Sequence, residues 1–238
     1  MPQMLGIPGV SSGRVTTARR LFVDGSAKYI AQSIVINGSL SRDPLNTSNV
    51  DYLRPGLLLG RITATNLYRP SLIGVTTGST IAAFTAITTI TAAAATVTEV
   101  ARLITVAAGN VNLTLTGPSS ANGPIGNLFF VATAASGTTI TITSIAPSTA
   151  FIVGSFIMPR DGSELPRTIL PEIDGASGVK VTDADAVSIN KTLDQYPVGG
   201  NLDSSQIVSW PSDTTLQNFI VQNVNDVAGC KFFFDHRI

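Results

Sequence analysis

A long stretch of almost uncharged sequence constrains this chain more than any other feature. Between Pro70 and Pro159 the only charged side chains are those of Glu99 and Arg102. The stretch includes TTGSTIAAFTAITTITAAAATVTEV, which is rich in Thr, Ala, Ile and Val. So neutral a segment can be a membrane insert, a disordered tract or a packed β domain, and each of these implies a different kind of protein.

The composition of this stretch argues against two of the three interpretations. A membrane-spanning helix needs about 20 predominantly apolar residues, whereas here Thr recurs every two or three positions, and Gly74 and Gly78 interrupt the start. Disordered segments are typically charged and poor in β-branched residues. Thr, Ile and Val instead favour strands, because branching at Cβ suits a pleated surface. The sequence therefore predicts a mainly β protein with one or two short helices.

The composition of the whole chain limits the kinds of partner. Of the 238 residues, 13% are charged, about half the usual share of roughly 25%, and the formal net charge is zero. A near-neutral surface attracts nucleic acid and anionic membranes only weakly, so neither is predicted as a partner. The start, MPQMLGIPGVSSGR, lacks the apolar core of a signal peptide. The single cysteine, Cys230, lies in an apolar run and is expected to be a small buried residue.

Alternating apolar and polar residues predict strands in several segments. The Ser136-Gly137 turn predicts a hairpin between two of these strands, and an Asp-Gly pair predicts another hairpin over residues 20–30. Strands are expected over residues 30–38, 57–65, 80–91, 111–116, 127–134, 138–145, 205–210 and 230–238.

The segment around residues 55–65 carries further backbone signals. Pro55-Gly56 suits the centre of a type II turn, because Gly supplies the positive φ that the second central position requires. Gly60 inside the following strand indicates a bulge or a close approach of another backbone segment. One face of this strand is predicted to be buried, and it comprises Leu58, Gly60, Ile62 and Ala64.

Two segments have the apolar spacing of amphipathic helices. In residues 92–104, apolar side chains recur at intervals of three and four, and Glu99 and Arg102 are three residues apart and can pair. In residues 211–229, an apolar stripe follows Ser212 and Asp213, either of which can cap the helix, and Gly229 is expected to end it.

Changes in composition divide the chain into three parts. Residues 1–20 contain Pro and Gly without any periodicity and are predicted to form an extended N-terminal arm. Residues 21–70 and 157–238 are predicted to form a β-rich body. Residues 71–156, with their Thr- and Ala-rich and charge-poor sequence, are predicted to form a β subdomain inserted into that body. The arm contains Arg14, Arg19 and Arg20, so it is interpreted either as a solvated tail or as an arm that grips a partner.

The sequence contains no arrangement of residues typical of an active site. His236 is the only histidine, and no nucleophile-elbow motif is present. One His and one Cys make a zinc site improbable, and Asp174, Asp183 and Asp185 lack the spacing of an EF-hand calcium loop, which favours a polar turn there. The chain is therefore predicted not to be an enzyme and to need no metal or cofactor; a structural or binding protein fits better. Tyr52, Tyr68 and Trp210 are expected to pack in the core or at a subunit interface.

One run of residues resembles a known protein family. The segment YLRPGLLLGRITATNLYRP, residues 52–70, is similar to a motif of the head-decoration, or cement, proteins of tailed bacteriophages, the family of lambda's decoration protein. The family's pattern is matched at Arg54-Pro55-Gly56, at the apolar residues 57–59 and at Gly60 to Thr63, and it continues to a Tyr and a Pro at 68 and 70. The segments SRDPLNTSN, DGSELPRTILPEID and VGGNLDSSQI also resemble parts of the family, so the similarity covers residues 20–70 and 157–238.

The resemblance implies a fold and a function. The fold would be a small β-tulip-like body with one packed helix, usually in a homotrimer, although dimers occur among cement proteins. The function would be to bind the outer surface of the virion capsid and staple neighbouring major capsid subunits against the pressure of packed DNA. The candidate capsid contacts are Arg14, Arg19, Arg20, Arg54 and Pro55, and the candidate subunit-interface residues are Tyr52, Tyr68 and Trp210.

A second function stays open at the level of the sequence. The Thr-rich insert could belong to a surface-displayed receptor- or glycan-binding module, such as a head fibre or adhesin. A cluster of exposed aromatic side chains on the insert would favour that alternative.

Overall fold

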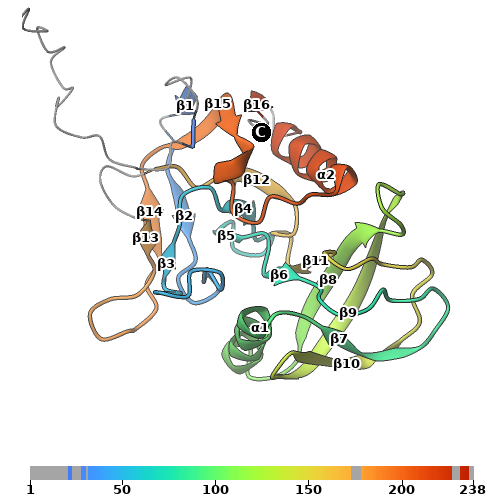
Figure 1. Cartoon of the computed structure of the whole chain (residues 1–238). Helices are drawn as coiled ribbons and strands as arrows, with labels where there is room; N and C mark the ends of the chain where they lie inside the picture. The colour runs from blue at the N-terminus through green and yellow to red at the C-terminus, as the bar shows by residue number, and fades with distance from the viewer. Residues whose placement is uncertain (1–20, 23–27, 31, 173–177, 227–230, 236–238) are drawn as a thin grey trace, which may run out of the picture.

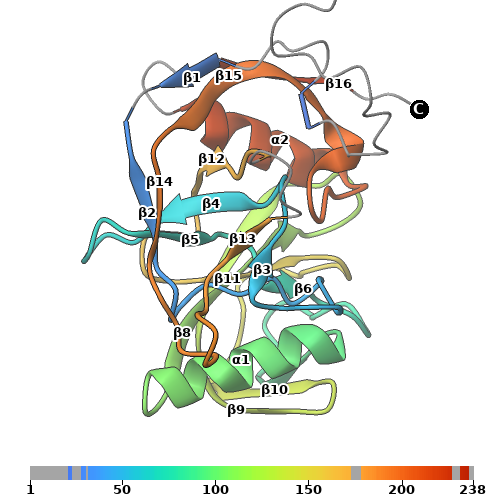
Figure 2. The same cartoon turned by 90° about the vertical axis from the view of Figure 1, so that its left-hand side faces the viewer.

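The computed structural model confirms a mainly β protein, with two α-helices in the part of the chain that it describes (Figure 1). The described residues are 21–22, 28–30, 32–172, 178–226 and 231–235. The predicted arm, residues 1–20, the Asp-Gly turn at 24–25, Gly229 and Cys230 lie outside these residues. The two helices lie at opposite ends of the molecule in both views (Figures 1 and 2).

A five-stranded sheet forms the centre of the body. Its order is β12-β4-β5-β2-β14, with β4 antiparallel to both of its neighbours and β2 parallel to β5. The strands are β2 (Ile34–Ile36), β4 (Leu58–Arg61), β5 (Tyr68–Pro70), β12 (Pro166–Ile169) and β14 (Lys191–Leu193). A two-stranded antiparallel pair, β3 (Tyr52–Leu53) and β13 (Val179–Lys180), lies beside it.

Strand β4 is buried on both faces, which differs from the single buried face predicted. Leu58 packs in one apolar cluster, whereas Leu57 and Leu59 pack in another, because β4 is an interior strand between two cores. The strand is also shorter than predicted: the backbone turns at residues 62–66, where Ile62 N–H donates to the carbonyl of Leu67 at 2.8 Å. Ala64 is exposed in that turn, so its predicted burial is wrong.

A three-stranded sheet with order β1-β15-β16 packs against helix α2 (Thr214–Asn225). Its strands are β1 (Lys28–Ile30), β15 (Tyr196–Asp203) and β16 (Lys231–Asp235). The predicted helix forms, with Asp213 as its cap, since the carboxylate accepts from the N–H groups of Thr215 and Leu216, but it ends at Asn225, before the predicted end at Gly229. The strand predicted over 205–210 is wrong: residues 204–206 form a 3-10 turn, because Asp203 caps it by accepting from Ser205 N–H at 3.0 Å.

A six-stranded sheet with order β6-β11-β8-β9-β10-β7 carries helix α1 (Ala94–Val106), which lies across β8, β9 and β10 (Figure 2). The strands are β6 (Gly74–Val75), β7 (Ile87–Thr91), β8 (Val111–Pro118), β9 (Ile125–Ser136), β10 (Thr139–Ile145) and β11 (Phe156–Pro159). Helix α1 and the hairpin at Ser136-Gly137 confirm their predictions. Of the strand predicted over 80–91, only β7 forms; Phe84 has a φ of +57° and donates its N–H to Pro147, which breaks the alternation.

Strand β11 is shared by two hydrophobic cores. Phe156 and Met158 belong to the cluster under α2, whereas Ile157, between them, belongs to the cluster under α1. Side chains of a strand alternate between its faces, so this one strand presents a surface to each core. The division of the chain into a body and an insert stays a prediction, but the two cores meet along β11.

Candidate functional site

The predicted contact residues Arg54 and Pro55 belong to a tight internal turn. Leu57 N–H donates to the carbonyl of Arg54 at 3.3 Å, and Gly56 has a φ of +86°, which is the type II turn that the sequence predicts. The turn is fixed from outside, because Val208 N–H donates to the Gly56 carbonyl at 3.1 Å. Pro55 is half-buried in this position.

The guanidinium group of Arg54 is bound within the molecule. Its Nε lies 2.6 Å and its Nη2 3.0 Å from the two carboxylate oxygens of Asp43. Asp43 is fully buried, and its Oδ1 also accepts from Leu45 N–H at 3.2 Å. A bidentate Arg–carboxylate pair of this kind fixes orientation as well as adding energy. Arg54 therefore holds the loop 43–54 in place. Arg14, Arg19 and Arg20 lie outside the described residues.

The three aromatic residues predicted for an interface lie in separate parts of the fold. Tyr52 is on β3, where it pairs with Lys180, and Tyr68 is on β5 and packs against the core of the five-stranded sheet. Trp210 stacks on Phe234 with ring centroids 5.2 Å apart, in the core under α2. The structure does not bring these three residues together, and all three are half-buried.

The two charged residues of the neutral stretch meet the body through α1. Arg102 binds Glu99 with both Nε, at 2.7 Å, and Nη2, at 2.6 Å, which confirms the predicted pair. Arg102 Nη1 also donates to the carbonyl of Ser39 at 2.6 Å. Arg42, in the same body loop, pairs with Asp51 at 2.7 Å. Glu99 is buried, so its carboxylate binds Arg102 inside the molecule and does not hydrate the surface.

Two arginines near this contact between α1 and the body, Arg69 and Arg42, have lowered pKa values. Burial lowers the pKa of Arg69, while Asp161, which it contacts at 3.2 Å, and Glu99 oppose that shift. Burial likewise lowers the pKa of Arg42, and the nearby charge of Arg102 adds to the effect. The Nε of Arg69 is buried without a hydrogen-bond partner in the described structure. The sequence pattern missed both arginines, because Arg69 pairs with Asp161, 92 positions away, and Arg42 reaches Asp51 across an irregular loop.

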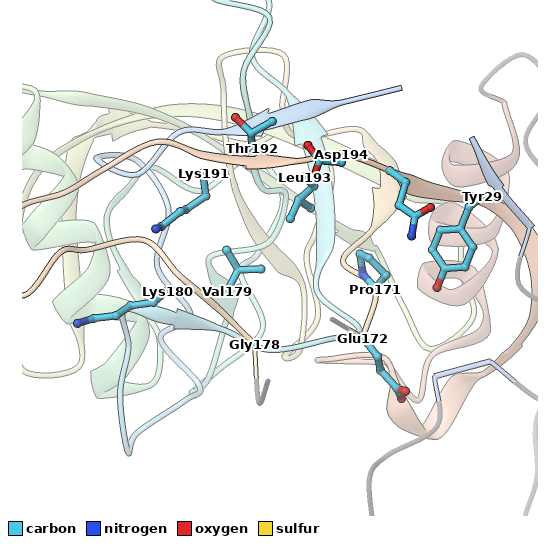
Figure 3. A pocket seen from close by; sticks show the side chains of 11 residues that line it. Tyr29, Pro171, Glu172, Gly178, Val179, Lys180, Lys191, Thr192, Leu193 and Asp194 are labelled. Atoms are coloured by element: carbon cyan, nitrogen blue, oxygen red, sulfur yellow. The ribbon is translucent and has the colours of Figure 1, made fainter. Parts of the chain in front are cut away.

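The open groove in Figure 3 lies between β13 and β14 and has a volume of about 520 Å³. Its walls are formed by Tyr29 of β1 and by residues 171–172, 178–180 and 191–195. Lys180 and Lys191 extend to one end of the groove, and Glu172 and Tyr29 lie toward the other (Figure 3). Burial, followed by the charge of Glu172, raises the pKa of Tyr29.

The described residues contain no group of three or more metal-ligating side chains that could hold an ion. Of the three aspartates considered above, Asp174 lies outside these residues. Asp183 accepts from the N–H groups of Asp185, at 3.0 Å, and Val187, at 2.8 Å, which is the bonding of a polar turn. Neither α1 nor α2 is long and apolar enough to cross a membrane.

Comparison of the chain with protein-family models, curated proteins and solved structures gives no significant match.

Proposed function

We propose that this chain is a structural virion protein that binds the outer surface of a phage capsid. Its partners are the major capsid protein and further copies of itself, in a homotrimer or a dimer. Bound across neighbouring capsid subunits, it stabilises the head against the outward pressure of packed DNA. No chemical reaction is part of this function.

The observation that carries the proposal is the run of residues 54–63 that resembles the decoration family. In this chain the run forms one structural unit, a type II turn that leads directly into β4. The Tyr and Pro that complete the pattern are the ends of β5, which pairs with β4. The residues of the pattern thus coincide with the centre of the five-stranded sheet, as expected if they define a shared body.

The same geometry divides scaffold residues from candidate capsid contacts. A Cβ added to Gly60 would lie 1.9 Å from the carbonyl oxygen of Ser163, and Gly56 needs a positive φ, so both glycines serve the fold. Arg54 serves the fold as well, through Asp43. Of the proposed capsid contacts, this leaves the half-buried Pro55 and the basic residues of the arm, Arg14, Arg19 and Arg20.

The mechanism of stabilisation is mass action combined with avidity. A ligand that binds the assembled shell but not its separated subunits stabilises the shell by about 2.7 kcal/mol at a hundredfold excess over Kd. An oligomer that touches several capsid subunits gains a further factor of roughly 10²–10⁴ in avidity. Strand addition by the arm to a sheet edge of the capsid would supply main-chain hydrogen bonds.

Cosedimentation with decoration-free phage heads tests the proposal. The full chain is expected to sediment with the heads up to a saturating number of copies, and a variant lacking residues 2–20 is expected to bind at least tenfold more weakly. Light scattering and circular dichroism on both proteins establish that the truncated protein keeps its oligomeric state and fold. Failure of the full chain to bind any such head would overturn the proposal.

One observation favours the receptor-binding alternative. Phe84 is 83% exposed on the neutral stretch, and Phe129 of β9 is also exposed, with Arg160 stacked 4.1 Å from its ring centroid. Large apolar side chains displayed in this way can contact a sugar or a host protein. Under this alternative, Phe84→Ser would abolish binding to host cells; under the capsid proposal, it would leave head binding unchanged.

A further inference from the structure

Two unpaired strand edges border the groove in Figure 3. In the described part of the chain, β13 bonds only to β3, and β14 is the last strand of its sheet, bonded only to β2. The hairpin that joins them is closed beyond the groove, where Ile189 N–H donates to the Val181 carbonyl at 2.9 Å. Toward the groove the two strands separate to join different sheets. An extended segment that enters here can bond to a strand edge.

The N-terminal segment leaves the described structure at the rim of this groove. Leu21 is 1% exposed, and its backbone N–H donates to Oε1 of Glu172 at 2.7 Å. Its carbonyl accepts from Asp203 N–H at 3.0 Å, so Leu21 is fixed on both sides. Glu172 is itself one wall of the groove. Residues 1–20 are therefore attached to the described structure beside the groove, and this tether raises their local concentration there.

The chemistry of the segment matches the nearer end of the groove. Arg19 and Arg20 directly precede Leu21, and the groove carries the carboxylate of Glu172 at this end. Just before these arginines come Val15, Thr16 and Thr17, whose branched side chains favour the extended conformation of a strand. Charge and backbone preference both suit a strand that runs from Leu21 into the groove.

We propose that residues 14–20 bind as an added β-strand in the groove between β13 and β14 of the same chain. The bound strand pairs with a strand edge that has no partner strand among the described residues, and Arg19 and Arg20 lie next to Glu172. The inference concerns the free protein in solution, where no capsid competes for the same segment, so its failure and the failure of the proposed function are distinguishable.

Hydrogen exchange on the full chain tests the inference. Thr17→Pro removes a backbone donor from the proposed strand while keeping the length and charge of the segment. Amides at residues 178–181 and 191–195 are expected to exchange at least tenfold faster in this variant, and those of β8 and β9 are expected to be unchanged, which reports an intact fold. The matched control, Gln3→Pro, lies outside the proposed strand and should leave all of these rates as they are. Equal rates at the groove in Thr17→Pro and the unsubstituted protein would overturn the inference.

Disulfide trapping distinguishes the chain's own segment from that of a second copy. In a Cys230→Ala background, Thr17→Cys is paired with Thr192→Cys, which lines the groove, or with the exposed Thr133→Cys on β9 as a control. Oxidation of dilute protein is expected to give an intrachain crosslink with Thr192→Cys at least tenfold faster than with Thr133→Cys. Crosslinks formed only between chains, or equal rates for the two pairs, would overturn the proposal.

Discussion

At the residue scale, several of the chain's few charged side chains bind one another inside the molecule. Asp43 is fully buried against Arg54, and Glu99 is buried against Arg102. Buried pairs of this kind add little net stability, because desolvation offsets the attraction, but losing one partner leaves the other uncompensated. We infer that these pairs fix how loops and helices meet. Between Pro70 and Pro159, where the only two charges form one of these pairs, exposed polar surface comes from neutral side chains such as those of Thr85, Thr88 and Thr89.

Substitution of Glu99 tests most strictly whether these buried pairs fix the contacts between loops and helices. Glu99→Gln removes the buried carboxylate that binds the partly exposed guanidinium of Arg102, so the free energy of unfolding is expected to fall by about 2 kcal/mol. Urea denaturation followed by circular dichroism measures the change. Asp185→Asn, an exposed carboxylate in a polar turn, is the matched control and should leave stability unchanged. A loss no larger than that of the control would show that the Glu99–Arg102 pair contributes nothing to the free energy of unfolding.

Gly60 provides a second test at the same scale. The added Cβ of Gly60→Ala would lie 1.9 Å from the Ser163 carbonyl oxygen, so the backbone must move, and a loss of about 2 kcal/mol is expected. Gly109→Ala is the control, because nothing lies within 4 Å of its added Cβ. Its stability should stay the same or rise slightly, since Ala restricts the unfolded chain. Equal effects of the two substitutions would contradict the close approach predicted from the sequence.

At the scale of elements, the sequence predicted the helices and the hairpin whose formation depends on residues close together in the chain. Helices α1 and α2 and the β9–β10 hairpin follow from apolar spacing, a cap and a Gly turn, all of which lie within a short window of sequence. Residues 205–210 alternate like a strand, yet the Asp203 carboxylate starts a 3-10 turn there. The groove between β13 and β14 could not be predicted, because it depends on which distant strands, β2 and β3, each of them joins.

The cap of α2 also joins the helix to the neutral stretch. Asp213 accepts from two helix N–H groups and from Asn122 N–H at 2.9 Å, while Asn122 accepts from the N–H of Thr214 at 3.1 Å. Asp213→Ala is expected to lower the free energy of unfolding by about 1–2 kcal/mol. Asp213→Asn retains an acceptor and should recover most of that loss. Thermal denaturation of both variants checks this, and an Ala variant as stable as the Asn variant would contradict the capping role.

At the scale of the whole molecule, the shared strand β11 couples the two cores. Phe156 and Met158 face the core under α2, and Ile157 faces the core under α1. Neither core can lose its side of β11 without exposing the other, so we expect the two to unfold together.

A comparison of two probes checks this coupling. Trp210 is the only tryptophan and reports on the core under α2, whereas hydrogen exchange of β8 to β10 reports on the core under α1. Both probes are expected to give the same denaturant midpoint, as a two-state transition requires. Two separate midpoints would show that the insert is an independent folding unit.

The heat stability of DNA-filled, decoration-free phage heads tests the central claim most directly. The temperature at which these heads release DNA is measured while the protein is added in increasing amounts. If the chain staples capsid subunits, the release temperature rises with the number of copies bound and stops rising at saturation, because binding favours the intact shell. A release temperature that stays constant while the protein saturates the heads would contradict the stapling function.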